Sequence, residues 1–216
     1  SGAATTGVVR VLPIGSISRG RKGEEVAPLT EMASAGVIGY SDDGSPVLDS
    51  RLMRRALDYS CALGLPIIDH CEDTALAAGG LINEGDISAR LGLRGIPPAA
   101  EEIMVTRDLA LARQTGGWLH VAHVSTEGSV ELIRRAREMD VRVTAEVTPH
   151  HLTLTEEEVI DFNTNAKVNP PLRTEKDVQA LIQGIKDNVI DIIATDHAPH
   201  TEAEKRSEFA LAPFGI

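Results

Sequence analysis

The chain has 216 residues, of which 42% are hydrophobic and 25% are charged, as in an ordinary globular protein, and only 3% are aromatic. The core is therefore expected to be aliphatic, and the formal net charge of −11 argues against a nucleic-acid-binding surface. No apolar run approaches the ~18 residues of a transmembrane helix. The two cysteines, Cys61 and Cys71, are too few for a disulfide framework, so a cytoplasmic location is predicted.

Short β-branched runs alternate along the chain with longer segments of helical periodicity, which predicts a parallel sheet covered by helices. Ser50 is a candidate N-cap for the first of the helices, Gly64 is its candidate stop, and Thr174 and Asp177 have capping-box spacing before the last. The predicted strands cover residues 8–14, 36–41, 65–71, 118–124, 141–148 and 191–196, and the predicted helices cover 51–63, 100–114, 127–139 and 175–186.

Six such β–α units are typical of either an open doubly wound sheet or part of a (β/α)₈ barrel. No G-x-G-x-x-G motif follows the first predicted strand, so the dinucleotide-binding form of the open sheet has no support. A complete barrel usually needs about 250 residues. If the chain is a barrel, two of its eight strands are therefore missing.

Histidine and aspartate residues gather where these predicted strands end. The carboxyl ends of parallel strands build the active sites of barrels and open α/β sheets, so we expect the side chains to meet. A single histidine in such a place is usually a hydrogen-bonded structural residue, and the argument therefore lies in the set. The set comprises Asp43, His70, His120, His123, His150, His151, His197 and His200.

The residue types in this set fit a divalent metal site. Imidazole nitrogen and carboxylate oxygen together suit Zn²⁺. In hydrolases a carboxylate can bridge two ions about 3.5–4 Å apart, which polarise a carbonyl and lower the pKa of a bound water. Asp196 ends the last predicted strand beside His197, so it is the natural candidate for moving the proton. The alternative is an ordinary polar turn after a strand.

Seven motifs in a fixed order make the pattern specific. They are GYSDDGSPV, IIDHCED, HVAHVST, TAEVTPHHL, TNAKVNPPLR, ATDHAPHT and APFGI. The series resembles the type I dihydroorotases of the amidohydrolase superfamily, which are metal-dependent (β/α)₈ barrels. The resemblance implies that residues 1–216 form a single incomplete domain, a partial barrel with about six of the eight parallel strands.

The reaction implied by the resemblance is the reversible cyclisation of N-carbamoyl-L-aspartate to dihydroorotate in de novo pyrimidine biosynthesis, so the partner is a small-molecule substrate. By the same resemblance, Asp43 is the carboxylate that bridges two zinc ions, and His70 and His123 bind one of them. Asp196 resembles the metal-bound general acid/base. The stretch 200–213 resembles a mobile active-site loop, and the residues similar to substrate contacts are Asn169, His200, Pro213, Phe214 and Gly215.

Several neighbouring residues have structural interpretations instead. Asp42 is expected to shape the turn with Gly44, and His120 is expected to face the barrel wall because it alternates with the ligand position. Cys71 is expected to be a small buried residue, since no arrangement that pairs its thiolate with a histidine is evident. For three residues the sequence allows either a supporting role or a direct role in the site: His150, His151 and Arg173.

The resemblance also indicates what this chain lacks. The family has a strand with H-x-H-x-R, whose histidines bind the first metal, and then a strand ending in PN; neither occurs here. We therefore expect a fragment, the ordered part of a longer chain or a truncated paralogue, which holds at most one zinc ion firmly and has little activity alone. Two open sheet edges favour a homo-oligomer or a covering partner.

Two other functions compete with a dihydroorotase. A hydantoinase or allantoinase requires a lysine at the bridging position, and GYSDDG offers none. A non-catalytic dihydroorotase-like subunit would instead bind aspartate transcarbamoylase and would often have lost metal ligands. The retention of Asp43, His70, His123 and Asp196 favours a catalytic parent.

Overall fold

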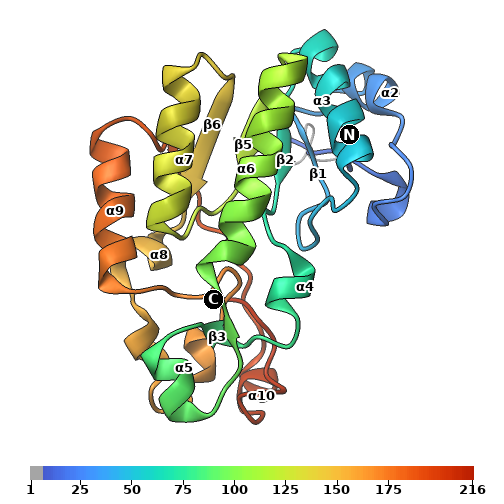
Figure 1. Cartoon of the computed structure of the whole chain (residues 1–216). Helices are drawn as coiled ribbons and strands as arrows, with labels where there is room; N and C mark the ends of the chain where they lie inside the picture. Colours follow the sequence, from blue (N-terminus) through green and yellow to red (C-terminus); the bar gives the residue numbers. More distant parts are fainter. Residues whose placement is uncertain (1–6) are drawn as a thin grey trace.

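The computed structural model describes residues 7–216, and its centre is a five-stranded sheet. All neighbouring strands are parallel, and their order in the sheet follows their order in the chain (Figure 1). Their carboxyl ends consequently lie at the same edge. The strands are β1 (Tyr40–Ser41), β2 (Ile67–Asp69), β5 (Leu119–Val121), β6 (Val143–Val147) and β7 (Ile192–Ile193).

The four predicted helices are confirmed and pack side by side along the sheet. They contact one another in chain order, first with second, second with third and third with fourth (Figure 1). This arrangement is what right-handed crossovers between successive parallel strands produce. The helices are α3 (Ser50–Leu63), α6 (Pro98–Thr115), α7 (Glu127–Glu138) and α9 (Glu175–Lys186).

The helix ends follow the capping chemistry of their sequences, with one correction. The Asp49 carboxylate, not the Ser50 hydroxyl, caps α3, because it accepts hydrogen bonds from the backbone N–H groups of residues 51 and 52. Ser50 is the first helical residue. Gly64 ends the helix in the left-handed conformation, as predicted. Thr174 and Asp177 form the predicted capping box of α9.

The aliphatic core lies between these helices and one face of the sheet. On β6, the side chains of Val143, Ala145 and Val147 are buried, whereas those of Thr144 and Glu146 are half-buried. This alternation means that the helices cover one face of the strand and the other face is only partly covered.

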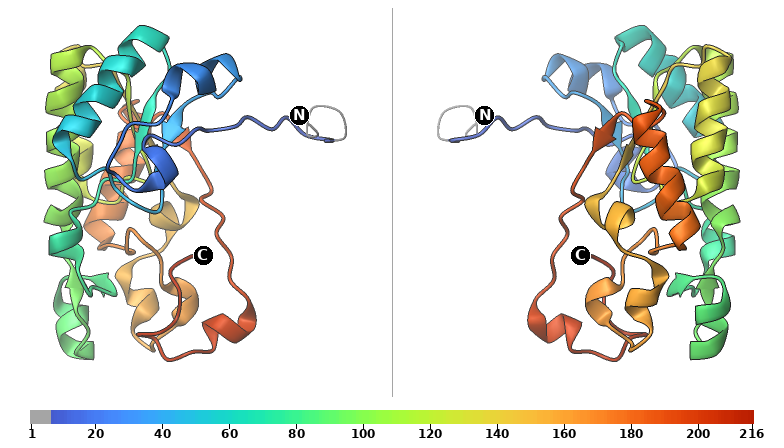
Figure 2. Two further views of the ribbon diagram at one scale, coloured as in Figure 1. Left: turned by 90° about the vertical axis from the view of Figure 1, so that its right-hand side faces the viewer. Right: turned by 90° about the vertical axis from the view of Figure 1, so that its left-hand side faces the viewer.

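The strand predicted at residues 8–14 is wrong. The segment is extended, but the only bridge near it joins Gly15 to Tyr40, and Val8 is fully exposed. Pro13 lacks an N–H group, so it cannot donate to a neighbouring strand, although its carbonyl accepts from the Ile38 N–H group. A β-branched run without a pairing partner projects from the body of the molecule (Figure 2).

A second group of elements lies beyond the carboxyl ends of the strands and was not predicted (Figure 1). It contains a two-stranded parallel ribbon of β3 (Ile82–Asn83) and β4 (Gly95–Ile96) and has its own small apolar core, which includes Phe209. The other short elements of the chain are η1 (Arg19–Arg21), α2 (Leu29–Ser34), α4 (Thr74–Ala77), α5 (Asp86–Leu91), α8 (Pro149–Thr153), η2 (Glu156–Val159), η3 (Thr164–Ala166) and α10 (Glu202–Lys205).

Arg173 joins this group to the sheet. Its buried guanidinium donates to the Asn83 side-chain oxygen at 2.8 Å, to the Ile96 carbonyl at 2.7 Å and to the Ser125 hydroxyl at 3.2 Å. These partners come from three separate segments. The Ile96 carbonyl also accepts from the Glu84 N–H group at 3.1 Å, but the side-chain oxygens of Asn83 and Ser125 would lose their donor if the guanidinium were removed. Arg173 is therefore a structural residue.

Replacing Arg173 by methionine is expected to lower the free energy of unfolding by about 2–4 kcal/mol, because buried acceptors are left without partners. Urea denaturation measures the change. The control is Arg134→Met, which removes a more exposed ion pair with Asp187 and should cost less than about 1 kcal/mol. Equal losses in the two variants would contradict the structural role of Arg173.

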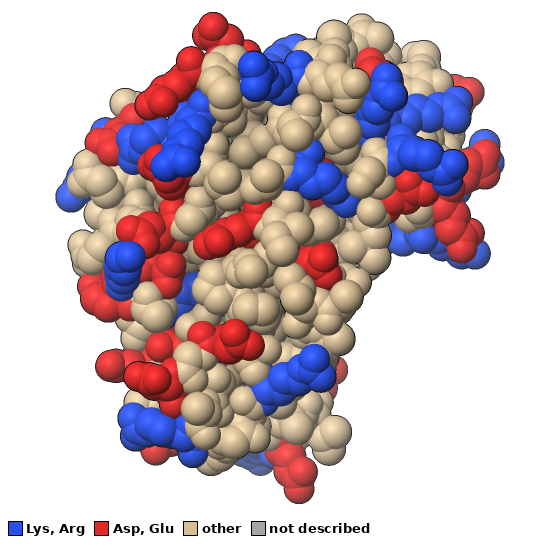
Figure 3. Space-filling view, viewed as in Figure 1, with Lys and Arg blue, Asp and Glu red and all other residues tan. Residues whose placement is uncertain are grey.

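The visible surface carries both signs of charge. Lys and Arg side chains are interspersed with Asp and Glu side chains on the face shown in Figure 3. Within residues 7–216, no helix combines the length and apolarity needed to cross a membrane.

Candidate metal centre

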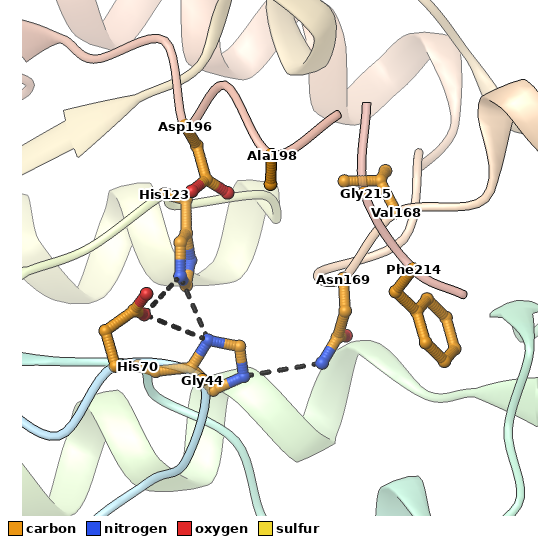
Figure 4. A pocket seen from close by; sticks show the side chains of 10 residues that line it. Gly44, His70, His123, Val168, Asn169, Asp196, Ala198, Phe214 and Gly215 are labelled. Carbon is orange, nitrogen blue, oxygen red and sulfur yellow. Dashed lines mark hydrogen bonds and ion pairs between the residues drawn. The ribbon is translucent and has the colours of Figure 1, made fainter. Parts of the chain in front are cut away.

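Four of the predicted residues meet in one cavity at the carboxyl ends of the strands. Asp43 follows β1, His70 follows β2, His123 follows β5 and Asp196 follows β7. The cavity has a volume of about 290 Å³. Residues 168–169 and 214–215 form another part of its wall (Figure 4). The full lining is Asp43, Gly44, His70, His123, Val168, Asn169, Asp196, Ala198, Phe214 and Gly215.

Three side-chain atoms converge on one point of this cavity. His70 Nδ1 lies 3.0 Å from His123 Nε2. Asp43 Oδ1 lies 3.7 Å from His70 Nδ1 and 3.4 Å from His123 Nε2. The two imidazole rings meet edge to face with centroids 4.7 Å apart, and both side chains are buried. The structure therefore brings these three predicted residues together, and their metal-binding role stays a prediction.

This donor set fits a divalent cation. Two imidazole nitrogens and a carboxylate oxygen all lie within 4.8 Å of one another, and such a mixed set suits Zn²⁺ and related ions. The second nitrogen of His123, Nδ1, is buried and has no hydrogen-bond partner within the described residues. The two imidazole nitrogens and the carboxylate oxygen face one another, and a cation placed among them would accept a lone pair from each.

The electrostatics of the three groups are strongly coupled. The hydrogen bond from His123 and the nearby imidazole of His70 hold the pKa of Asp43 far below its usual range. Burial by itself would lower the pKa of His70, but the nearby carboxylates of Asp43 and Glu72 outweigh burial and raise it to about 9. Without a metal ion, His70 therefore carries a proton at neutral pH, and a cation must displace it.

This shift predicts how the metal-free protein responds to pH. His70 has a higher pKa when folded, about 9, than its ordinary value of 6.5, so its stabilising effect is full below pH 6.5 and disappears as pH rises through 9. The loss is on the order of 3 kcal/mol at most. Thermal unfolding of the metal-free protein and of His70→Gln between pH 6.5 and 9.5 measures it. A constant difference between the two proteins across this range would refute the prediction.

Glu72 is a supporting residue that was not predicted from the sequence. Its Oε2 atom lies 3.6 Å from His70 Nε2, on the side of the ring that faces away from Asp43. The Asn169 amide nitrogen lies 3.4 Å from the same His70 nitrogen. A carboxylate behind a ligand histidine fixes the ring and its tautomer. The usable signal was the carboxylate two positions after the histidine in DHCED.

Asp196 lies above this cluster and points toward His123 (Figure 4). Both residues have left-handed backbone angles, with φ of 46° at Asp196 and 33° at His123. Such angles are uncommon outside glycine and mark places where the chain is held away from its preferred conformation. Here they turn the chain sharply at the strand ends, next to the cavity.

Asn169, Phe214 and Gly215 line the cavity, whereas two other predicted substrate contacts do not. His200 Nε2 hydrogen-bonds to the Phe214 carbonyl at 2.9 Å, and the Pro213 carbonyl accepts from Lys205 Nζ at 3.0 Å. Both therefore lie behind the lining residues and hold the segment that carries them. Their substrate-binding roles stay predictions.

The other histidines near the strand ends have separate environments. His120 bonds to the Thr144 hydroxyl at 2.8 Å and to the Glu146 carboxylate at 3.1 Å, so it lies against the neighbouring strand as expected. His151 bonds to Thr148 at 2.8 Å and to the Pro170 carbonyl at 2.9 Å, which makes it structural. In the described chain, His150 Nε2 is buried without a partner, and His197 is exposed.

Asp42 and Cys71 are structural as well. The Asp42 carboxylate accepts from the backbone N–H groups of Ile17 at 2.9 Å and Ser18 at 3.1 Å, so it ties the preceding segment to β1 instead of facing the cavity. Cys71 lies between the buried carboxylates of Asp69 and Asp108. Burial raises the pKa of the Cys71 thiol, which excludes a reactive thiolate at neutral pH.

Comparison with known proteins places this geometry in a family. The family described as dihydro-orotase-like matches residues 3–129, which is more than half of the chain. The chain belongs to the dihydro-orotase-like family. Among similar relatives, a dihydroorotase of Pelotomaculum thermopropionicum is 58% identical over 97% of this chain and 49% of its own length. A dihydroorotase of Acetivibrio thermocellus is 56% identical over 99% of this chain and 50% of its own length.

The chain spans about half the length of the curated dihydro-orotase-like relatives it matches. Solved structures agree on the fold. An L-hydantoinase from Arthrobacter aurescens has a TM-score of 0.74 and 24% identity over 87% of this chain and 44% of that one. A Saccharomyces cerevisiae dihydroorotase in complex with 5-fluoroorotic acid has a TM-score of 0.64 and 18% identity over 87% of this chain and 53% of that one. The predicted fold class, a partial (β/α)₈ barrel, is confirmed.

Proposed function

We propose that this chain provides most of the active site of a zinc-dependent dihydroorotase, which interconverts N-carbamoyl-L-aspartate and dihydroorotate. The observation that carries the proposal is the convergence of Asp43, His70 and His123 in one cavity with Asp196 above them. Family membership supports the same reaction. Two free cysteines, one of them exposed, are compatible with a cytoplasmic enzyme.

Each residue has a distinct role in this proposal. Asp43, His70 and His123 would hold zinc, and Asp196 lies beside them in the same cavity. Bound zinc supplies polarisation of the amide carbonyl and a water of lowered pKa. Asp196 would accept a proton and return it to the amide nitrogen of the opening ring. Substrate would be held by Asn169, Phe214 and Gly215, with His200 and Pro213 supporting them.

The direct experiment is a dihydroorotate hydrolysis assay on the protein encoded by the complete reading frame, with dihydrouracil and hydantoin as competing substrates. We expect turnover of dihydroorotate and little turnover of the other two rings. The 216-residue chain assayed alone is expected to retain at most one firmly bound zinc and little activity. Preferential hydrolysis of hydantoin, or full two-zinc activity of the short chain, would contradict these expectations.

The second candidate is a non-catalytic subunit that binds aspartate transcarbamoylase. A feature of the fold that favours some covering partner is the exposure of Ile192 and Ile193 on β7, at 48% and 56%. We expect the exposed edge at β7 to be covered by the rest of a single barrel domain or by a second copy of the chain. Size-exclusion chromatography with and without aspartate transcarbamoylase separates the possibilities, and the hydrolysis assay decides whether the subunit is catalytic.

A further inference from the structure

The Lys167 side chain is the most fully enclosed ammonium group of the described chain that has no carboxylate beside it. The residue is 2% exposed. Its Nζ atom donates to the carbonyls of Phe209 at 2.8 Å, Ala210 at 3.2 Å and Ala212 at 2.7 Å. Three carbonyls thus take up the three N–H donors of one lysine.

Aromatic faces complete the enclosure of the Lys167 ammonium. Nζ lies 5.4 Å from the centroid of the Phe209 ring and 4.7 Å from that of the Phe214 ring. Rings at these distances attract a cation through their quadrupoles. A desolvated cation held only by carbonyls and rings is expensive to bury, so its place next to a cavity calls for an explanation.

The backbone of Lys167 holds the same segment from the other side. The Lys167 carbonyl accepts from the Gly215 N–H group at 2.9 Å. Gly215 and Phe214 line the cavity, and so do Val168 and Asn169, which directly follow Lys167. Figure 4 shows Val168 and Asn169 beside Phe214 and Gly215 in the cavity wall. Lys167 therefore connects these two parts of the wall.

The held segment has little freedom to shift. Gly215 has a φ of 141°, and a Cβ atom there would lie 2.3 Å from the Ala198 carbonyl oxygen and 2.9 Å from the His200 ring. Lys205 donates to the carbonyls of Pro213 and Thr164, both at 3.0 Å. A small displacement of residues 209–215 would consequently move the cavity wall.

We propose that Lys167 is a positioning residue, whose ammonium group gathers the carbonyls of segment 209–215 and sets Phe214 and Gly215 at the distance that substrate requires. The effect on catalysis rests on the proposed dihydroorotase function. The effect on the order of the segment does not. Lys167 acts through Phe214 and Gly215, and its Nζ donates to backbone carbonyls and not to the metal-ligand cluster.

The test compares Lys167→Met with wild type in the protein from the complete reading frame, with Lys186→Met, at the exposed end of α9, as the matched control. We expect Lys167→Met to speed amide hydrogen exchange in residues 209–215 and to lower kcat/KM roughly 10- to 100-fold, mainly through KM. Zinc content should stay unchanged. Lys186→Met should match wild type in every readout.

Unchanged exchange in residues 209–215 of folded Lys167→Met overturns the proposal. If Lys167→Met exchanges faster but the wild-type protein does not hydrolyse dihydroorotate, the proposed function is overturned. The positioning role of Lys167 then still stands. A second measurement needs no variant: acetic anhydride labelling of the native wild-type protein, read by mass spectrometry, should modify Lys186 and spare Lys167. Modification of both lysines at similar rates overturns the enclosure on which the proposal depends.

Discussion

Replacing His123 by alanine is expected to remove tight zinc binding and to lower dihydroorotate turnover by roughly a thousandfold or more, since a catalytic ion contributes several kcal/mol to the transition state. The reason is geometric. His123 Nε2 has the shortest distances to the other two donor atoms of the cluster, at 3.0 Å and 3.4 Å. Without it, only one imidazole and one carboxylate remain at this point. Metal content by mass spectrometry and steady-state kinetics measure the two effects.

His197→Ala is the matched control for this experiment. His197 is exposed, follows Asp196 directly and does not line the cavity. It should keep both zinc and activity. If His123→Ala retains zinc at wild-type affinity, then the metal is held elsewhere and the assignment of the three-residue cluster fails.

Replacing Asp196 by asparagine is expected to lower kcat about 10²- to 10⁴-fold, the usual contribution of a positioned general acid or base. The amide has nearly the same shape as the carboxylate but cannot accept and return a proton at neutral pH. Zinc held by the cluster should remain, because Asp43, His70 and His123 are untouched. The loss therefore separates proton transfer from metal binding.

The comparison variant is Asp187→Asn, which alters an aspartate at the surface end of α9 and should leave kcat unchanged. If kcat of Asp196→Asn equals that of the wild type, the proton transfer belongs to another residue.

The main sheet was predictable because its segments repeat one pattern. In β2, β5 and β6, apolar side chains fill a core between the sheet and its helices, and α3, α7 and α9 are amphipathic, so periodicity marks both kinds of element. The segment 8–14 carries the same apolar residues, yet Pro13 and the lack of a pairing neighbour leave it unpaired. In this segment apolar composition predicts neither burial nor a strand, because strand formation also needs a pairing partner.

The candidate site was predictable in part for the same reason. Parallel strands bring their carboxyl ends together, so Asp43, His70 and His123 could be grouped before their distances were known. Lys167 could not, because its role depends on an irregular segment that packs beyond the sheet. Glu72 had only one sequence signal, its position two residues after His70. The short ribbon of β3 and β4 has no periodic signal, since each strand is two residues long.

The match between strand order and chain order bears on how the protein is made. During synthesis, chains emerge from the amino terminus and begin to fold as units while the rest is still being added. Each strand from β2 to β7 of this five-stranded sheet can join the edge that the preceding strand of the sheet presents. The residues Asp43, His70 and His123 are all present once α7 has emerged, whereas Asp196 comes only after β7. The three-residue cluster is therefore synthesised well before the fourth acidic or imidazole residue of its cavity.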